Sequence, residues 1–304
     1  MRAFRQSLLA GLALACGGGA PALAQALPDL EGVWDTSSIT PFERLPIDGR
    51  GAIPQSEEAA YVAEIRRGVP HLVDPDFDIA NLSRLIRVKG ELRTSVVVDP
   101  PDGHIPYTAE GERLLNLGPA TVGMGAGYDN PEERSTFDRC VGGTGAPPMR
   151  PIPAPVPLQI VQTGDSVVLM IEDVYGFREV PLNRPHPMAA IPDFDGRSTG
   201  RYEGGALVIE TTGFRDDWLY RDLPGPSFLI GAGSKVTERL SRVSADELLY
   251  TFTVEDPRFY TQPWRGEQTF VRIKKPRLEY ACHEGNRALE HILLSGRIDD
   301  ERGK

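Results

Sequence analysis

The stretch KVTERLSRVSADELLYTFTVED, residues 235–256, indicates how this chain folds. Two strand-like segments, 235–243 and 247–256, flank a short polar turn at 244–246. In the second segment, residues at every second position are apolar or aromatic: Leu248, Tyr250, Phe252 and Val254. Because successive strand residues point to opposite faces, these four share one face. The stretch therefore predicts an antiparallel hairpin with one buried side.

The same pattern recurs through the second half of the chain. Segments 158–163 and 166–173 flank Gly164-Asp165, and segments 201–203 and 206–212 flank Gly204-Gly205, as in two-residue hairpin turns. Further strand-like segments are LPDLEGVWD (27–35), FREVPL (177–182) and EQTFVRIKK (267–275). Seven or eight strands in sequential hairpins, with no βαβ alternation, predict a mainly β domain. We expect an antiparallel sheet that is closed or nearly closed into a barrel.

Helices are expected only at the periphery. Four short segments have helical composition: 55–68, 78–90, 107–118 and 286–296. Asn286 is the expected N-cap of the last one. Residues 119–157 are rich in Gly and Pro, so a long irregular segment is expected there, and long ordered loops often carry function.

The N-terminus resembles a secretory signal. Arg2 and Arg5 precede an apolar run that is too short to span a membrane, and the small-residue motif at 22–24 provides a cleavage site. We therefore expect a signal peptide over 1–24, a single barrel domain over 25–304, and a periplasmic or secreted protein. Cys16 leaves a lipid-anchored form as the alternative.

Charge and motifs limit the partners. The net charge of −10 and the lack of a basic stripe argue against nucleic acid, and no later segment is apolar enough for membrane insertion. Phosphate-binding glycine motifs are absent, so no cofactor is expected.

After removal of the signal, Cys140 and Cys282 remain, and an even pair in an exported protein predicts a disulfide. The oligomeric state is left open.

Two motifs suggest chemistry that the surrounding sequence does not favour. GRSTG (196–200) matches the pattern of serine hydrolases, with Ser198 as nucleophile and Asp216 and His283 as later partners. That pattern requires a strand before the serine and a helix after it, whereas here a Gly-Gly hairpin follows, so a polar turn is favoured. The adjacent Cys282 and His283 do not have a metal-chelating spacing, and no metal is expected, although a site from distant residues stays open.

Polar residues in or beside the strands provide the remaining candidates. Arg178 and Arg201 each enter a strand between apolar or aromatic neighbours. A buried arginine needs an anion, which is either a glutamate of the barrel or a ligand carboxylate. Candidate proton-transfer residues are Tyr175, His186 and Tyr202, and Glu203, His283 and Glu284 are secondary candidates. Many such residues simply meet solvent.

GRYEGGALVIETTGF (200–214) and EYACHEGN (279–286), together with LEGVWD and QIVQTGDSVVLMIED, resemble a large family of exported bacterial proteins. The resemblance covers about residues 28–298. Typical members read closer to GRWEGDTLVVDTTNF, so Tyr202 replaces a Trp and Gly205 an Asp. Gly32 and Trp34 also resemble the opening of lipocalin-like (calycin) barrels, which makes a lipocalin-like barrel the expected fold.

The resemblance implies a function. Sphingomonad relatives look like cofactor-independent decarboxylases of phenylcoumaran-type lignin dimers, which are similar in kind to phenolic acid decarboxylases. It therefore implies a carbon–carbon lyase acting on a small aromatic acid. The chemistry of such a reaction, rather than the resemblance, leads us to expect that Arg178 or Arg201 binds the carboxylate and that Tyr175, His186 or Tyr202 moves the proton. A lipocalin-like carrier without catalysis and a hydrolase using Ser198 are the alternatives.

Overall fold

The computed structural model describes residues 27–47, 49–68, 84–117, 128–134, 138–141, 145–151, 153, 156–173, 176–185, 191–216, 220–221 and 228–302. The expected signal peptide, residues 1–24, lies outside the described residues. Nine strands form the main sheet: β1 (Gly32–Asp35), β6 (Pro157–Gln162), β7 (Ser166–Ile171), β8 (Arg178–Pro181), β9 (Arg197–Glu203), β10 (Ala206–Thr212), β13 (Lys235–Arg242), β14 (Glu247–Glu255) and β15 (Trp264–Arg272). A further short strand, β5 (Val97–Asp99), pairs with β15.

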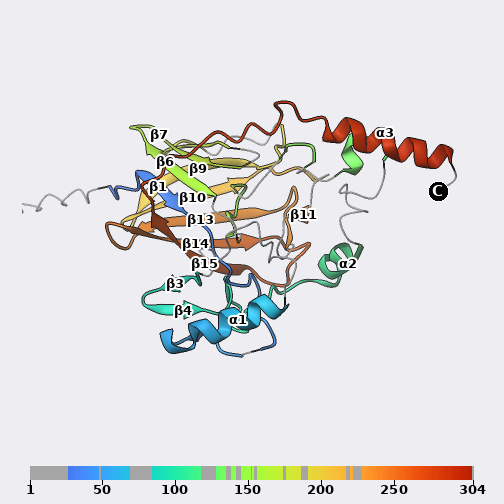
Figure 1. Cartoon of the computed structure of the whole chain (residues 1–304). Helices are drawn as coiled ribbons and strands as arrows, with labels where there is room; N and C mark the ends of the chain where they lie inside the picture. Colours follow the sequence, from blue (N-terminus) through green and yellow to red (C-terminus); the bar gives the residue numbers. More distant parts are fainter. Residues whose placement is uncertain are drawn as a thin grey trace, which may run out of the picture.

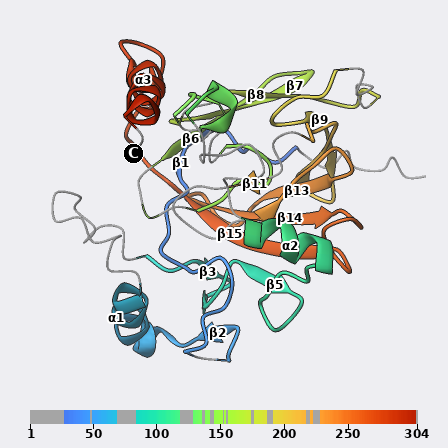
Figure 2. The same ribbon diagram turned by 90° about the vertical axis from the view of Figure 1, so that its right-hand side faces the viewer.

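The nine strands form a nearly closed antiparallel barrel (Figures 1 and 2). Apart from β8 and β9, each of the nine strands pairs with the next one along the chain, and β15 returns to pair with β1. In a closed ring with an odd number of strands, one neighbouring pair must run parallel. That pair is β8 and β9, which form no ladder and are joined by the parallel bridge between Leu182, just after β8, and Gly200, and by a hydrogen bond from the Thr199 hydroxyl to the Pro181 carbonyl. The mainly β, barrel-like architecture expected from the hairpin pattern is confirmed.

The hairpins occur where the sequence predicted them. β6 and β7 flank the turn at Gly164-Asp165, β9 and β10 flank Gly204-Gly205, and β13 pairs along its length with β14. The last strand is shifted, since it begins at Trp264 rather than at residue 267 and ends at Arg272. The predicted face of β14 is buried, because Leu248, Tyr250, Phe252 and Val254 are at most 1% exposed.

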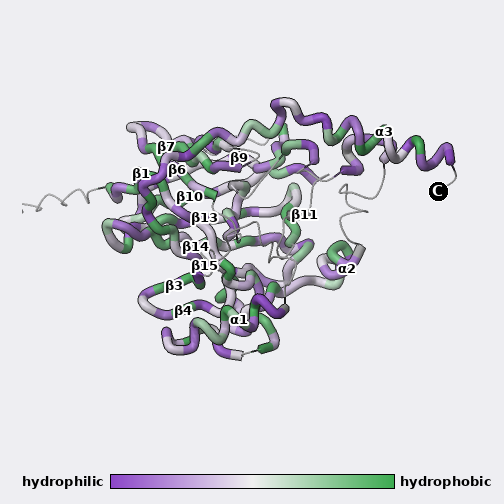
Figure 3. Tube along the Cα trace, in the orientation of Figure 1, coloured by the Kyte–Doolittle hydropathy of each residue, from purple (hydrophilic) through white to green (hydrophobic). Residues whose placement is uncertain are grey.

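Helices and short strands surround the barrel. The helices are α1 (Glu58–Gly68), α2 (Ala109–Leu117) and α3 (Ala288–Glu301), with two 3₁₀ turns, η1 (Gln55–Glu57) and η5 (Pro131–Glu133). The short strands are β2 (Ala52–Ile53), β3 (Arg87–Val88), β4 (Glu91–Arg93), β11 (Tyr220–Arg221) and β12 (Phe228–Leu229). The helix α1 packs on the small sheet of β2, β3 and β4, whereas α3 extends away from the barrel and carries long hydrophilic stretches (Figures 1 and 3).

The helix expected over 78–90 is wrong in its described part. Residues 87–88 form strand β3, which pairs with β4 in a tight hairpin. The connecting residues, Lys89 and Gly90, both have positive φ angles of 51° and 86°, as a type I′ turn requires. The C-terminal helix begins at Ala288 rather than directly after Asn286, but the Asn286 side-chain oxygen still accepts a hydrogen bond from the Ala288 amide at 2.9 Å.

Candidate functional site

The most unusual feature of the barrel interior is a buried ion pair between β8 and β13. Arg178 follows the inward alternation of β8, two residues before the fully buried Val180, and Glu238 lies between the buried Val236 and Leu240. The Arg178 guanidinium donates two hydrogen bonds to the Glu238 carboxylate, at 2.7 and 2.9 Å. The Arg178 side chain is 11% exposed and that of Glu238 is 0% exposed. The buried arginine therefore takes its anion from a glutamate of the barrel.

Burial and the neighbouring negative charges act in opposite directions on the pKa of Arg178. Burial lowers the pKa of its guanidinium, but the charge and hydrogen bonds of Glu238 outweigh this, and the net pKa is raised. The nearby charge of Asp195 acts in the same direction as that of Glu238. Arg178 is thus held as a cation between two carboxylates.

Tyr250 extends the ion pair into a network. Its hydroxyl donates to Glu238 at 2.7 Å and accepts from the backbone amide of Met149 at 2.8 Å. Burial raises the pKa of Tyr250 well above its usual range, and the negative charge of Glu238 raises it further. The phenol is therefore held in its protonated, neutral form.

The irregular Gly/Pro-rich region supplies the last part of this network. We call residues 145–150 the strap. The Met149 carbonyl accepts a hydrogen bond from the Gln268 side chain at 3.0 Å, so both backbone groups of Met149 bond to barrel side chains. Arg150 lies over the ring of Phe228 at 5.4 Å, and a Cβ at Gly145 would lie 2.6 Å from Ile171. The strap thus crosses one end of the barrel from β7 to β12.

Three buried polar atoms in this interior have no hydrogen-bond partner: Arg178 Nε, Trp264 Nε1 and Gln268 Oε1. The first two are donors and the third is an acceptor. Leaving such a group buried and unpaired costs about 1–3 kcal/mol, so native structures rarely retain one without a bound water or ligand. These atoms mark the interior as a candidate binding site.

Aromatic rings line the interior around the network. Tyr250 stacks on Phe270 with ring centroids 5.2 Å apart, and Phe252 meets Trp264 edge-on at 5.6 Å. Phe42 and Phe228 stack at 5.4 Å near the end that the strap crosses. Rings in such offset and edge-on arrangements pack favourably on one another. The interior is therefore aromatic, with a small set of polar groups at its centre.

The opposite end of the barrel is closed by residues near the N-terminus. The side-chain amide of Gln162 donates to the Tyr202 hydroxyl at 2.5 Å and to the Pro28 carbonyl at 3.0 Å. Its oxygen accepts from the Leu30 amide at 2.6 Å. Tyr202, a predicted proton-transfer residue, therefore lies at the barrel end away from the strap.

The contact between Trp34 and Arg272 explains why Gly32 lies two positions before the tryptophan. The guanidinium of Arg272 lies 4.4 Å from the centroid of the Trp34 ring. Gly32 has a φ of 135°, and a Cβ added there would lie only 2.3 Å from the Arg272 guanidinium. The Gly-x-Trp spacing thus makes room for an arginine to cover the tryptophan.

Other predicted site residues lie outside the barrel interior. Arg201 points to the outer face, where it pairs with Glu203 at 2.8 Å and with Glu210 at 2.6 Å. His283 and Glu284 are exposed in the turn before α3. Tyr175 and His186 lie outside the described residues, so their roles stay predictions. Among the candidates in the described chain, only Arg178 reaches the central network.

The polar turn expected at GRSTG is instead the first half of strand β9. Ser198 is 6% exposed, and its hydroxyl shares a hydrogen bond with that of Thr211 at 2.8 Å. Asp216, its proposed acidic partner, pairs with Arg258 at 3.2 Å. A strand rather than a strand-to-helix turn surrounds the serine, so the described geometry gives the hydrolase hypothesis no support.

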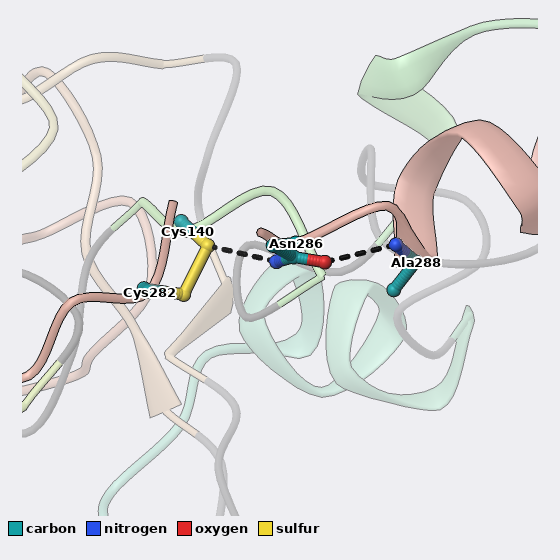
Figure 4. Close-up of a disulfide and its surroundings, with 4 residues drawn as sticks. All are labelled: Cys140, Cys282, Asn286 and Ala288. Atoms are coloured by element: carbon teal, nitrogen blue, oxygen red, sulfur yellow. Dashed lines mark hydrogen bonds between the residues drawn. A yellow bond between two sulfur atoms is a disulfide. The ribbon is translucent and has the colours of Figure 1, made fainter. Parts of the chain in front are cut away.

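The predicted disulfide is present. Cys140 and Cys282 are bonded, with their Cα atoms 5.8 Å apart, and the Asn286 side chain donates to the Cys140 sulfur at 3.2 Å (Figure 4). The bridge attaches the region just before the strap to the segment between β15 and α3. A disulfide is typical of oxidising compartments, which is consistent with export.

Within the described part of the chain, no cluster of three or more His, Cys, Asp or Glu side chains is arranged to hold a metal ion. Among the described helices, none combines the length and the apolar character needed to cross a membrane.

Fold and interior together define a nearly closed antiparallel β-barrel with an aromatic-lined interior and a buried Arg–Glu–Tyr network. No protein-family model matches the chain, and no curated protein matches it either. One matching solved structure is a mutant of the fluorescent protein UnaG, at 16% identity and a TM-score of 0.27, covering 46% of this chain and 86% of that one. A similarity this low supports no conclusion about this chain. The barrel is defined by its own strand pairing.

Sequence reasoning did not select two members of the network as site residues, although a signal existed for each. Glu238 interrupts the apolar alternation of β13, and a carboxylate on a buried face requires a cation. Tyr250 occupies the apolar face of β14, where its hydroxyl needs a partner. The strap gave no such signal, because its contacts with Tyr250 and Gln268 span 101 and 119 residues.

Proposed function

We propose that this protein binds a small, uncharged aromatic molecule inside its barrel. The observation that carries the proposal is the set of three unpaired buried atoms, Arg178 Nε, Trp264 Nε1 and Gln268 Oε1, in an interior lined by aromatic rings. Ligand sites in proteins are mostly apolar, with a few polar groups that fix orientation. Two donors and one acceptor suit a ligand that carries both an oxygen acceptor and a hydroxyl.

The charge of the network favours a neutral ligand. Both guanidinium bonds of Arg178 to an anion are already made to Glu238, and Asp195 adds a second negative charge nearby. A further buried anion at this position would be an uncompensated charge, which costs several kcal/mol. A phenol, an aromatic alcohol or an ester avoids that cost.

The spacing of the unpaired atoms suggests the length of the ligand. Trp264 and Gln268 lie four residues apart on the inward face of β15. At 3.3 Å per residue, this separation is about 13 Å along the strand. A two-ring aromatic molecule has about that length and would contact both residues.

A cofactor-independent lyase acting on an aromatic carboxylate in the periplasm is the second candidate. It is supported by the resemblance to lignin-dimer decarboxylases and by Tyr250, which burial and Glu238 hold protonated. In this proposal the carboxylate replaces Glu238 on Arg178, and CO₂ leaves while the bonding electron pair stays on the conjugated substrate. Tyr250 then gives its proton to that carbon, a step of the kind that contributes about 10²–10⁴-fold.

A matched pair of ligands tests both candidates. A hydroxybiphenyl carboxylic acid and its methyl ester are titrated into the protein while the tryptophan fluorescence, to which the buried Trp34 and Trp264 contribute, is recorded. We expect the ester to bind at least about tenfold more tightly than the acid at pH 7, a difference of about 1.4 kcal/mol. Loss of the acid with release of CO₂ from chelator-treated protein, abolished in Tyr250→Phe, would instead establish the lyase.

Two isosteric variants provide the control. Gln268→Met removes one of the three unpaired atoms and should weaken ester binding, because an acceptor is lost from the site. Arg201→Met removes an arginine on the outer face and should leave binding unchanged. If no aromatic ligand gives saturable quenching, or if both variants bind as the wild type does, the proposal is wrong.

A further inference from the structure

The strap covers Tyr250 and Gln268 at one end of the barrel. Its residues 146–150 are all buried, with Met149 only 2% exposed. The two hydrogen bonds of the Met149 backbone go to Tyr250 and Gln268, which are also the groups that the proposed ligand would contact. A molecule entering this end of the barrel must therefore displace the strap or pass beneath it.

The disulfide attaches the strap to the outside of the barrel. Cys140 lies five residues before Gly145, and its partner Cys282 belongs to the C-terminal segment. That segment is itself anchored to the barrel, since the Leu278 amide donates to the Glu172 carboxylate, just beyond the end of β7, at 2.6 Å. The bridge thus connects the strap to a fixed support.

The bridge can be reached from solvent on one side. A surface cavity of about 430 Å³ opens beside Cys282 and is lined by Asp138, Glu279, Tyr280 and Asn286. Cys140 is 4% exposed, whereas Cys282 is partly exposed and lies in an exposed turn. An attacking thiolate would therefore reach the Cys282 sulfur first.

We infer that the Cys140–Cys282 disulfide controls access to the barrel interior by holding the strap in place. This inference rests on the proposed function, because it concerns entry of the same ligand. A dithiol reductant attacks the Cys282 sulfur and releases the Cys140 thiolate. Its second thiol then attacks the mixed disulfide, so the protein gains two electrons and two thiols while the reductant becomes a disulfide. The released strap can leave Tyr250 and Gln268.

Two measurements on the full mature chain test the inference. The first is hydrogen exchange at the Met149 amide, which reports the strap without any ligand. The second is the stopped-flow association rate of the hydroxybiphenyl methyl ester. In reduced protein, and in the Cys140→Ser/Cys282→Ser double variant, we expect both rates to rise about tenfold or more, because the strap is then no longer tied to the C-terminal segment and opens locally more often.

A second variant keeps the test valid if reduction unfolds the barrel. Gly145→Ala would bring a Cβ to 2.6 Å from Ile171 and push the strap away from β7 with the disulfide intact. It should also raise both rates. Ala would be tolerated at Gly164, where a Cβ meets nothing within 4 Å, so Gly164→Ala is the matched control and should change neither rate.

The possible outcomes distinguish the proposed binding function from the proposed role of the disulfide. Ester binding at equal rates in oxidised, reduced and Gly145→Ala protein would overturn the role of the disulfide and leave the binding function standing. Absence of ester binding in every state would overturn the binding function and the control of access together. Faster Met149 exchange without ester binding would show that the bridge holds the strap for a purpose other than this ligand.

Discussion

Replacing Glu238 by Gln tests whether the ion pair at the centre of the barrel is as buried as the geometry indicates. Glu238 is fully buried and accepts three hydrogen bonds, two from Arg178 and one from Tyr250. Gln has nearly the same shape but no charge. The substitution therefore leaves the Arg178 cation inside the barrel without its carboxylate, while most packing is kept.

The expected loss follows from burial. Removing one partner of a buried ion pair costs about 3–5 kcal/mol, because the other charge stays desolvated and uncompensated. That is a large part of a total stability of about 5–15 kcal/mol. The matched control is Glu210→Gln, which affects the outer pair with Arg201, where the two side chains are 31% and 44% exposed. An exposed pair of this kind contributes about 0–1 kcal/mol.

The assay is equilibrium urea unfolding of oxidised protein, followed by far-UV circular dichroism. We expect Glu238→Gln to lower the midpoint strongly at an unchanged slope, and Glu210→Gln to leave it nearly unchanged. The double variant Arg178→Met/Glu238→Gln should recover part of the loss, because the buried Arg178 charge is removed together with its partner. Equal urea midpoints for Glu238→Gln and Glu210→Gln would refute the reasoning. They would mean that the Arg178 guanidinium is hydrated and loses little when its carboxylate partner is removed.

Three further predictions follow from the same structure. Burial, together with the charge of Glu238, raises the pKa of Tyr250, so the native state keeps this proton to a higher pH than the unfolded chain does. Stability should therefore fall above about pH 10, by up to about 1.4 kcal/mol per pH unit, and urea unfolding at pH 9–11 should show that Tyr250→Phe lacks this slope. Gly32→Ala places a Cβ 2.3 Å from the Arg272 guanidinium at a φ of 135°, and it should cost about 1–3 kcal/mol, measured as a lower Tm. Cys282→Ser should lower the stability of oxidised protein by about 2–5 kcal/mol, whereas reduced wild type and variant should unfold alike; two free thiols in the denatured, unreduced wild type would contradict the bridge.

The hairpins could be predicted because their signals are local. A period of two in the side chains fixes the buried face, and Gly164-Asp165 or Gly204-Gly205 fixes the turn, so the register of each pair follows. The barrel then follows from the number of hairpins. The start of β9 was missed because Arg197 to Gly200 is polar and Gly-rich, yet its alternate residues, Ser198 and Gly200, are buried against β10.

The hairpin of β3 and β4 shows where composition misleads. Residues 78–90 contain apolar residues at spacings that fit one face of a helix as well as a strand, and short segments of this kind cannot be assigned by periodicity alone. The decisive feature is Lys89-Gly90, two residues that adopt positive φ angles in the structure. A Gly at the second turn position was the available signal.

The candidate site could be predicted only in part, because its contacts are long-range. The sequence indicated that a buried Arg178 would need an anion, either a barrel glutamate or a ligand. Choosing between them required the position of Glu238, which lies 60 residues later in the chain. Arg201 carried the same sequence signal and lies on the outer face, since one step of register decides which side of a strand faces the core.

The odd number of strands connects the fold to the site. Because nine strands cannot all be antiparallel in a ring, β8 and β9 are left with one parallel bridge, between Leu182 and Gly200, instead of a ladder. β8 is held on its other side by its ladder with β7, and the Arg178–Glu238 pair adds a link from the interior, between β8 and β13. The same pair presents the unpaired Nε of Arg178 to the interior. If the proposed ligand bonds this atom, its binding also stabilises the link between β8 and β13.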